Sequence, residues 1–216
     1  MLELGIKFLI SYFIGSIMGS MLMGNLRGGV DIRTMGSGNA GGTNALRTQG
    51  WRFAVGVIVI DVGKGVVATG IIPGIALPIV GNDPEISRTW LTICCAGASV
   101  IGHVWPMWYN FRGGKGAATI VGTLLILGPG VIFPVLVVWA LALVYSGYVG
   151  LATMLAGLSA PIYLVLKSPP LDQPLFIYCA ALALYMVFTH RSNIRGMRDG
   201  TEARNEHLML FRRRSR

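Results

Sequence analysis

The residues best suited to chemistry lie in a polar, glycine-rich stretch between two apolar runs, GHVWPMWYNFRGGKGAAT at residues 102–119. Its glycines let backbone N–H groups turn inward into a nest that binds anions, at Gly113, Gly114 and Gly116. Arg112 and Lys115 add two cations at the same place. We therefore predict that this stretch, including Gly102 and His103 at its start, binds a phosphate group. The competing interpretation is a membrane loop whose basic residues lie at the lipid headgroups.

Two nucleotide-binding motifs are excluded by spacing. A P-loop requires Gly at position 109 and Ser or Thr at position 116, where this chain has Tyr109 and Gly116. The glycines at 36, 38 and 41 match G-x-G-x-x-G, but they follow an apolar helix rather than a strand, and no βαβ unit surrounds them. We therefore expect no nucleotide cofactor, and no metal.

A second polar segment, MGSGNAGGTNALR, occupies residues 35–47. It offers hydrogen-bonding groups on a backbone that glycine leaves free to bend, at Ser37, Asn39, Thr43, Asn44 and Arg47. Gly36 and Gly38 flank the serine. Such a set suits phosphate or hydroxyl oxygens, so we predict that this segment also binds substrate.

The third polar segment covers residues 190–202, near the end of the chain. His190 and Asn193 lie one helical turn apart and can address the same ligand. A single His at a membrane interface is more often a structural residue than a catalyst. The companion Asn193 is what favours a site here.

The composition indicates a polytopic membrane protein. Of 216 residues, 53% are hydrophobic and only 12% are charged, which is too apolar for an ordinary soluble domain. The formal charge of +9 is concentrated in arginines after His190, so anionic lipid explains it better than nucleic acid does. The three cysteines have neither disulfide nor metal-ligand spacing. No cleavable signal peptide is evident, because the first apolar stretch is too long for one.

We predict an all-α integral membrane protein with seven transmembrane helices in a single domain, residues 1–216. A helix needs about 20 residues to cross the hydrocarbon core, and fewer where its ends are buried in protein. The predicted spans are Leu4–Gly24, Phe53–Ile72, Trp90–Val104, Ala117–Leu127, Val131–Tyr145, Val149–Leu166 and Pro174–Thr189. The sequence Gly-Pro-Gly at 128–130 separates the fourth span from the fifth.

The distribution of basic residues predicts the orientation. Fourteen Lys and Arg residues follow spans 1, 3 and 7, and three lie on the opposite side. The C-terminus is therefore predicted to be cytoplasmic and the N-terminus periplasmic. The outer loops are then Pro73–Arg88 and Lys167–Gln173.

Two spans carry residues that need a partner. Gly15 and Gly19 form a G-x-x-x-G pair in the first span, which favours close packing against a helix of the same chain, with homodimerisation as the alternative. Asp61 and Lys64 lie three apart in the second span and share one face. Each would cost about 2.5–3.5 kcal/mol alone at mid-membrane, so we expect a structural ion pair, with a catalytic role as the alternative.

The topology predicts where the three polar segments meet. They follow spans 1, 3 and 7, so all three should emerge on the cytoplasmic side and converge into one cationic, glycine-lined pocket. A pocket of this kind at a bilayer surface suits a phosphorylated soluble substrate that meets a lipid substrate. The oligomeric state is left open.

The segments GSGNAGGTNALR, GHVWPMWYNFRGGKGAAT and HRSNI followed by GTE resemble the bacterial acyl-phosphate:glycerol-3-phosphate acyltransferase family (PlsY). The resemblance covers nearly the whole chain and implies a seven-helix enzyme of the bacterial cell inner membrane, with its active site facing the cytoplasm. It implies transfer of a fatty acyl group from acyl phosphate to the sn-1 hydroxyl of glycerol 3-phosphate. The products would be lysophosphatidic acid and inorganic phosphate, in the first step of phospholipid biosynthesis.

The resemblance also implies roles for individual residues. Catalytic or substrate-binding roles fall on Ser37, Arg47, Lys115, His190 and Asn193, together with the glycines of the second segment. Glu202 matches a position that supports the integrity of the fold. The chain departs from the family pattern at Gly42, Arg112, Ala117, Thr189 and Gly196.

Two rival functions have sequence signatures of their own. An acyl-CoA-dependent acyltransferase commonly shows His-x-x-x-x-Asp, which none of the three His residues begins. An organic-phosphate transporter is the non-enzymatic alternative, but no inverted repeat is visible. The loops contain no G-x-S-x-G and no readable Ser-His-acid set, so we expect direct attack by the glycerol hydroxyl without an acyl-enzyme.

Overall fold

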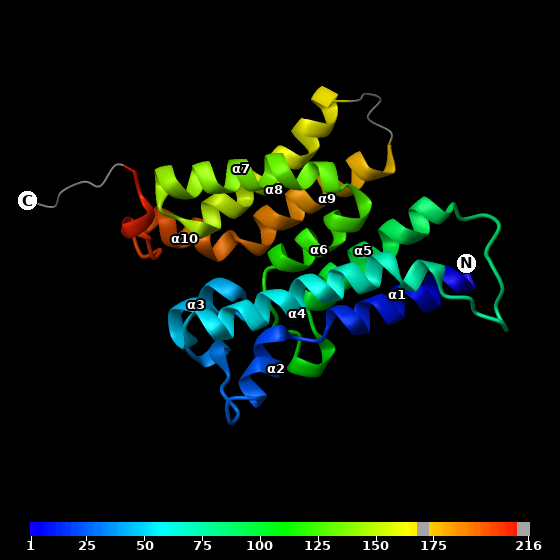
Figure 1. Cartoon of the computed structure of the whole chain (residues 1–216), viewed down its shortest axis with the longest axis horizontal. Coiled ribbons are helices and arrows are strands. Elements are labelled where there is room, and N and C mark those ends of the chain that lie inside the picture. The colour runs from blue at the N-terminus through cyan, green and yellow to red at the C-terminus, as the bar shows by residue number, and fades with distance from the viewer. Residues whose placement is uncertain (168–172, 211–216) are drawn as a thin grey trace, which may run out of the picture. The chain divides into compact units, whose positions relative to one another are not determined.

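The structure is a computed structural model that describes residues 1–167 and 173–210, and in these ranges all regular secondary structure is helical (Figure 1). The prediction of an all-α protein is therefore confirmed. The chain separates into two compact units, Met1–Leu127 and Gly128–Arg216, here called unit 1 and unit 2. Each unit is described by itself, and the single membrane domain stays a prediction.

Unit 1 contains six α-helices, α1 (Leu2–Gly15), α2 (Gly19–Asn25), α3 (Gly42–Gln49), α4 (Trp51–Gly70), α5 (Arg88–Val104) and α6 (Ala117–Leu127). Short 3-10 turns lie between them, at η1 (Ile32–Thr34), η2 (Ile72–Gly74) and η3 (Met107–Tyr109). Helix α1 packs on α5, α4 packs on α6, and α3 packs on the beginning of α4.

Unit 2 contains α7 (Pro129–Ser146), α8 (Val149–Lys167), α9 (Pro174–Thr189), α10 (Arg191–Arg198) and the 3-10 turn η4 (Glu206–Leu208). Helix α8 packs on both α7 and α9. Helix α7 begins at Pro129, so the predicted break before the fifth span is confirmed. Most of the predicted outer loop Lys167–Gln173 lies outside the described residues.

The count of membrane spans is confirmed only in part. Among residues 1–167 and 173–210, four helical segments are long and apolar enough to cross a membrane: α4 with η2, α5 with η3, α7 and α8. The pairs α1/α2 and α9/α10 also qualify when each is counted as one span, and they bend by 46° and 50°. Helix α6 is apolar but shorter, with the predicted bounds Ala117–Leu127. Seven crossings and the sidedness of the termini stay predictions.

The first span is broken, where a continuous helix was predicted over Leu4–Gly24. Helix α1 ends at Gly15 and α2 begins at Gly19, which leaves backbone groups between them without helical partners. Charged side chains of α4 supply those partners. Asp61 Oδ1 accepts from the N–H of Gly19 at 3.2 Å, and Lys64 Nζ donates to the carbonyl of Ile17 at 2.7 Å. A break at membrane depth is stable where protein groups satisfy it in this way.

Glycines bring the helices of unit 1 into close contact. A Cβ on Gly15 would overlap the backbone of Ser99 in α5, and one on Gly19 would lie 2.7 Å from the carbonyl oxygen of Val57 in α4. The prediction that the G-x-x-x-G pair packs within the chain is therefore confirmed. Gly65 and Gly122 make the same kind of crossing between α4 and α6.

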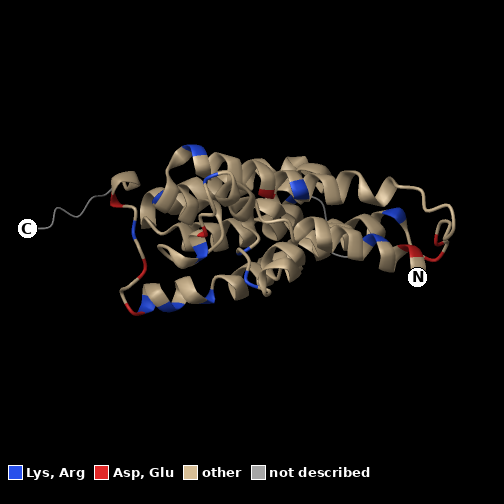
Figure 2. Cartoon of the chain, turned by 90° about the horizontal axis from the view of Figure 1, so that it is seen from below, with Lys and Arg blue, Asp and Glu red and all other residues tan. Residues whose placement is uncertain are grey.

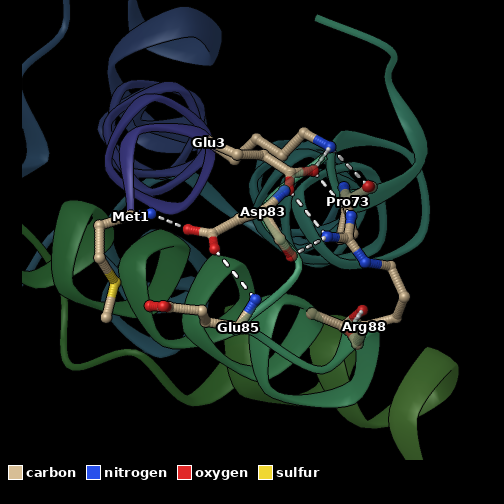
Figure 3. Close-up of polar contacts among 8 residues, drawn as sticks. Met1, Glu3, Pro73, Asp83, Glu85 and Arg88 are labelled. Atoms are coloured by element: carbon tan, nitrogen blue, oxygen red, sulfur yellow. Dashed lines mark hydrogen bonds and ion pairs between the residues drawn. The ribbon is translucent and has the colours of Figure 1, made fainter. Parts of the chain in front are cut away.

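One end of unit 1 is closed by charged side chains, and we call this the sealed end (Figure 3). Glu3, only 1% exposed, accepts from Arg88 through both carboxylate oxygens, at 2.7 and 2.8 Å. Lys7, equally buried, donates to Glu3 and to the carbonyl of Pro73, each at 2.7 Å. The N–H of Asp83 donates to Glu3, and the amino group of Met1 donates to the Asp83 carboxylate.

The sealed end fixes the direction of the three long helices of unit 1. Helices α1 and α5 both begin there, at Glu3 and Arg88, while α4 and η2 arrive there at Pro73. Helices α1 and α5 therefore run in the same direction, opposite to α4 (Figure 1). The long helices are mainly free of charge, and Lys, Arg, Asp and Glu gather towards helix ends and loops (Figure 2).

Candidate functional site

The loops that follow α2 and α5 lie together at the other end of unit 1, which we call the loop end (residues 31–47 and 105–116). Arg33 joins them: its Nη1 donates to the carbonyls of Tyr109 and Arg112, both at 3.2 Å, and its guanidinium lies over the Tyr109 ring. Arg33, two residues before the segment 35–47, thus links the approach to that segment with the glycine-rich stretch. The convergence of the three polar segments into one pocket stays a prediction. The sequence had marked Arg33 only as a basic residue.

Asp31 holds Arg33 in place. Its carboxylate accepts from Arg33 Nε and Nη2, the latter at 2.8 Å, and from the Arg33 N–H at 2.9 Å. These hydrogen bonds from Arg33 hold the pKa of the Asp31 carboxyl below its ordinary value. The pair therefore stays charged at neutral pH and fixes the two loops to each other.

Ser37 and Arg47 present unused donors at the loop end. Both are exposed, and within the ranges 1–167 and 173–210 neither the Ser37 hydroxyl nor the Arg47 guanidinium bonds to a protein group. Arg47 lies on α3, where the sequence predicted a freely bending loop. Apolar residues anchor this helix on α4 in a small core made of Ile32, Ala45, Phe53, Ala54 and Val57.

Asn44 was predicted to bind substrate, but the structure buries it and uses its amide for the fold. Its Nδ2 donates to the carbonyls of Ile32 and Met35, at 2.8 and 3.0 Å. Its Oδ1 accepts from the N–H of Ser37 at 3.0 Å. The side chain is 1% exposed, so it shapes the loop that presents Ser37 and does not face a ligand.

The glycine-rich stretch also differs from the predicted anion nest. The N–H groups of Gly113 and Gly114 donate to the carbonyls of Val104 and His103, both at 3.1 Å. A Cβ on Gly113 would overlap the His103 carbonyl, so this glycine lets the loop fold back onto the end of α5. Gly116 has φ +93°, which favours glycine, and it leads into the first turn of α6.

The part of this stretch that suits an anion is thereby limited to the start of α6. The first helical hydrogen bond of α6 runs from the N–H of Ile120 to the carbonyl of Gly116. The N–H groups of the first turn of α6 precede that bond and have no partner within the helix. Together with the side chains of Lys115 and Arg112, this turn is the part that suits a phosphate.

Gly102 and His103 were also predicted to bind substrate, and both are buried. A Cβ on Gly102 would overlap the backbone of Tyr12, so this glycine serves the crossing of α1 and α5. The His103 ring is 2% exposed and contacts the ion pair of α4. Neighbouring helices and loops cover both residues, so neither is exposed to contact a ligand directly.

The predicted pair of Asp61 and Lys64 is confirmed as an ion pair, with Nζ and Oδ1 3.1 Å apart. Lys64 Nζ also lies 2.7 Å from His103 Nδ1. An ammonium group has only donors, so Nδ1 accepts and the proton of the neutral ring lies on Nε2. Sequence spacing predicted the pair within α4 but not its third member from α5.

The third polar segment lies in unit 2, at the bend between α9 and α10. His190 Nδ1 donates to the carbonyl of Met186 at 2.8 Å, which orients the ring. Asn193 Nδ2 donates to Glu202 Oε1 at 2.7 Å. The backbone N–H of Glu202 donates to the carbonyl of Gly196 at 3.0 Å, and this hydrogen bond closes the turn that carries Glu202. Glu202 therefore holds Asn193, which gives its expected structural role a physical basis.

Two glycines of unit 2 help to position Asn193. A Cβ on Gly150 of α8 would lie 2.8 Å from the Asn193 side chain, so Gly150 leaves room for it. A Cβ on Gly196 would lie 2.9 Å from Glu202 Oε2, so this glycine, where the chain departs from the family pattern, accommodates the Glu202 carboxylate. Gly150 belongs to no motif, and sequence reasoning missed it.

The fold and the donors at the loop end point to a class: a helical protein with helices long and apolar enough to cross a membrane, and with a set of exposed donors that suits a phosphate group. The comparisons agree. A family model described as "Glycerol-3-phosphate acyltransferase" matches residues 5–200. Relatives with that name from Chlorobaculum tepidum and Salinibacter ruber are 35% and 36% identical, over 90% and 94% of this chain and 93% of each relative.

Solved structures match as well. Two crystal structures of PlsY, an integral membrane glycerol 3-phosphate acyltransferase, are 31% identical and give TM-scores of 0.78 and 0.76. Each match covers 93% of this chain and 94% of the other. The chain belongs to the glycerol-3-phosphate acyltransferase family. It is therefore an acyltransferase and an integral membrane protein.

Proposed function

We propose that the chain transfers a fatty acyl group from acyl phosphate to the sn-1 hydroxyl of glycerol 3-phosphate, forming lysophosphatidic acid and inorganic phosphate. The PlsY structures that it resembles are described as a glycerol 3-phosphate form and a lysophosphatidic acid form, an acceptor and a product of this reaction. The family membership favours an enzyme over an organic-phosphate transporter. The proposed setting is the inner membrane of a bacterium, with the loop end on the cytoplasmic side.

The observation that carries the proposal is the set of donors at the loop end of unit 1. Ser37 and Arg47 are exposed, and Arg33, four residues before Ser37, bonds to two carbonyls of the second loop. A planar guanidinium binds a phosphate through two parallel hydrogen bonds. We assign Ser37 and Arg47 to the substrate phosphate, with Asn39 and Thr43 beside them.

The second loop is assigned to the acyl phosphate. Lys115 and Arg112 supply positive charge, and the first turn of α6 supplies N–H groups and the positive end of a helix dipole. His190 and Asn193 of unit 2 are assigned to orienting the glycerol hydroxyl or the leaving phosphate. The Met186 carbonyl holds the His190 ring and the Glu202 carboxylate holds the Asn193 amide. A catalytic group must be positioned in this way.

The chemistry needs no covalent enzyme intermediate. The oxygen of the glycerol C1 hydroxyl attacks the carbonyl carbon of the acyl phosphate, and the bond from that carbon to the phosphate oxygen breaks. The departing phosphate takes up the hydroxyl proton and leaves as hydrogen phosphate. The enzyme contributes charge neutralisation and alignment, which hold the two substrates in a reactive geometry.

The test is product release by purified protein in detergent. With acyl phosphate and glycerol 3-phosphate as the only substrates, we expect lysophosphatidic acid and one equivalent of inorganic phosphate. Acyl-CoA offered in place of acyl phosphate should give no product. Turnover with acyl-CoA alone, or a radiolabelled acyl chain trapped on Ser37, would contradict the proposed donor or the direct transfer.

A further inference from the structure

A buried cluster lies among the helices of unit 1, and it is formed by Asp61 and Lys64 of α4 and by His103 in the last turn of α5. None of the three is more than 5% exposed. Lys64 Nζ lies 3.1 Å from Asp61 Oδ1 and 2.7 Å from His103 Nδ1, and the His103 Nδ1 to Asp61 Oδ1 distance is 3.5 Å. The cluster is therefore a single contact network rather than an isolated ion pair.

On one side the cluster holds the break in the first span. The N–H of Gly19 donates to Asp61, and the carbonyl of Ile17 accepts from Lys64. These are the backbone groups that lose helical partners where α1 ends and α2 begins. After α2 the chain continues through residues 26–36 to Ser37, so the charges of α4 hold the start of the segment that reaches that loop.

On the other side the cluster seats the glycine-rich loop. Lys64 fixes the His103 ring through Nδ1, and the opposite ring nitrogen, Nε2, faces Gly114. A Cβ on Gly114 would overlap Nε2, so ring and loop are in direct contact. The His103 carbonyl also accepts from the N–H of Gly114 at 3.1 Å. The position of Gly114, next to Lys115, thus depends on where the ring lies.

We propose that Asp61, Lys64 and His103 are positioning residues that set the geometry of both substrate-binding loops at once. A buried ion pair contributes little net stability compared with apolar residues of the same size, so stability alone explains this cluster poorly. Its contacts go to two backbone segments, and each of them runs into a loop with a proposed substrate role. The inference rests on the proposed function in assigning the glycine-rich loop to acyl phosphate.

The first test separates positioning from stability with a neutral replacement. Asp61→Asn and Lys64→Met each leave one buried charge without its partner and should lower the melting temperature. The double variant removes both charges, so its melting temperature should return towards that of the wild type. If the cluster positions the loops, kcat/KM for acyl phosphate stays at least about tenfold lower in the folded double variant. Wild-type kinetics in the double variant would overturn the proposal.

The second test uses the contact of His103 with Gly114 and does not depend on the ion pair. Gly114→Ala should lower kcat/KM by about tenfold or more and raise KM for acyl phosphate more than KM for glycerol 3-phosphate. His103→Asn keeps an acceptor for Lys64 and removes the part of the ring that faces residue 114. Adding His103→Asn to Gly114→Ala should therefore restore several-fold of the lost activity.

The control is Gly97→Ala in α5, where a Cβ would meet nothing within 4 Å, and it should keep wild-type rates. Additive losses in the His103 and Gly114 double variant would overturn the proposal, even if the ion-pair variants do not fold. Wild-type protein is assayed first with acyl phosphate. If it uses another donor, the proposed function fails, and the same comparisons of variants are made with that donor.

Discussion

The two ends of unit 1 use charge in opposite ways. At the sealed end, Glu3 and Lys7 are buried and paired with each other, and Glu3 also pairs with Arg88. At the loop end, Arg47 and Arg112 are exposed, and in the described ranges their guanidinium groups bond to no protein group. Under the proposed function, the difference is that buried, paired charge holds segments of the fold together, and exposed charge without a protein partner is left to bind the ligand.

The largest predicted effect belongs to the sealed end. Glu3→Gln should lower the free energy of unfolding by about 3 kcal/mol, because it leaves Lys7 buried without a counter-charge. The kcat/KM of the protein that remains folded should change less than about twofold. Thermal unfolding in detergent and initial rates check both parts, with the exposed Glu85→Gln as the control. A stable but inactive Glu3 variant would break the comparison.

His190→Ala should give the next largest effect, about a 100-fold loss of kcat, or roughly 2.7 kcal/mol. The Met186 carbonyl orients this ring, so it has a structural contact as well as a proposed role in alignment. A residue that aligns reacting groups should affect turnover more than binding. Steady-state kinetics for both substrates check this, with His207→Ala as the control. A rise in KM alone would demote His190 to a binding residue.

Arg47→Lys should lower kcat/KM by about tenfold, or roughly 1.4 kcal/mol, without changing the melting temperature. An ammonium group cannot reproduce the two parallel hydrogen bonds that a guanidinium makes to a phosphate. Arg52→Lys is the matched control, because Arg52 is also exposed and, within the described ranges, stacks on Trp51 without a hydrogen bond to protein. Equal kinetics for wild type and the Arg47 variant would remove Arg47 from the site.

Asp31→Asn should have the smallest effect, about a threefold loss of kcat/KM, or on the order of 0.6 kcal/mol for a partly exposed ion pair. The lowered pKa of Asp31 fixes the sign of its pH dependence. The contribution of the pair is complete above the ordinary carboxyl pKa and is lost as the pH falls through the lowered folded value. The ratio of wild-type to variant kcat/KM should therefore stay constant from about pH 6 to 8. A ratio that changes in that range would contradict this account of the pair.

The long apolar helices were predictable from the sequence, because a run of apolar residues of sufficient length predicts a membrane span. The bounds of α6 and α9 agree with the prediction, and α4 and α5 begin within two residues of it. The break between Gly15 and Gly19 was not predictable. It depends on Asp61 and Lys64, which lie more than 40 residues away and bond to its backbone.

The sequence predicted which segments could form the candidate site better than it predicted which of their residues could contact a ligand. Glycine in a polar loop indicates close approach, but the sequence does not say whether a ligand or another part of the backbone approaches. At Gly102 and Gly113 it is the backbone. Asn44 looked like a ligand donor because its type fits, and only its burial reveals the loop that it holds. Arg33 and Gly150 carry no motif, so no local pattern could have marked them.

The most direct test of the loop end as the phosphate-binding end is inhibition by inorganic phosphate. Initial rates are measured against each substrate at several phosphate concentrations, for wild type, Lys115→Met at the loop end and Arg88→Met at the sealed end. We predict competitive inhibition in the wild type, a rise of about tenfold in the inhibition constant for Lys115→Met, and no change for Arg88→Met. An inhibition constant that Lys115→Met leaves unchanged, or that Arg88→Met alters as much, would contradict the division of the unit into a stabilising end and a binding end.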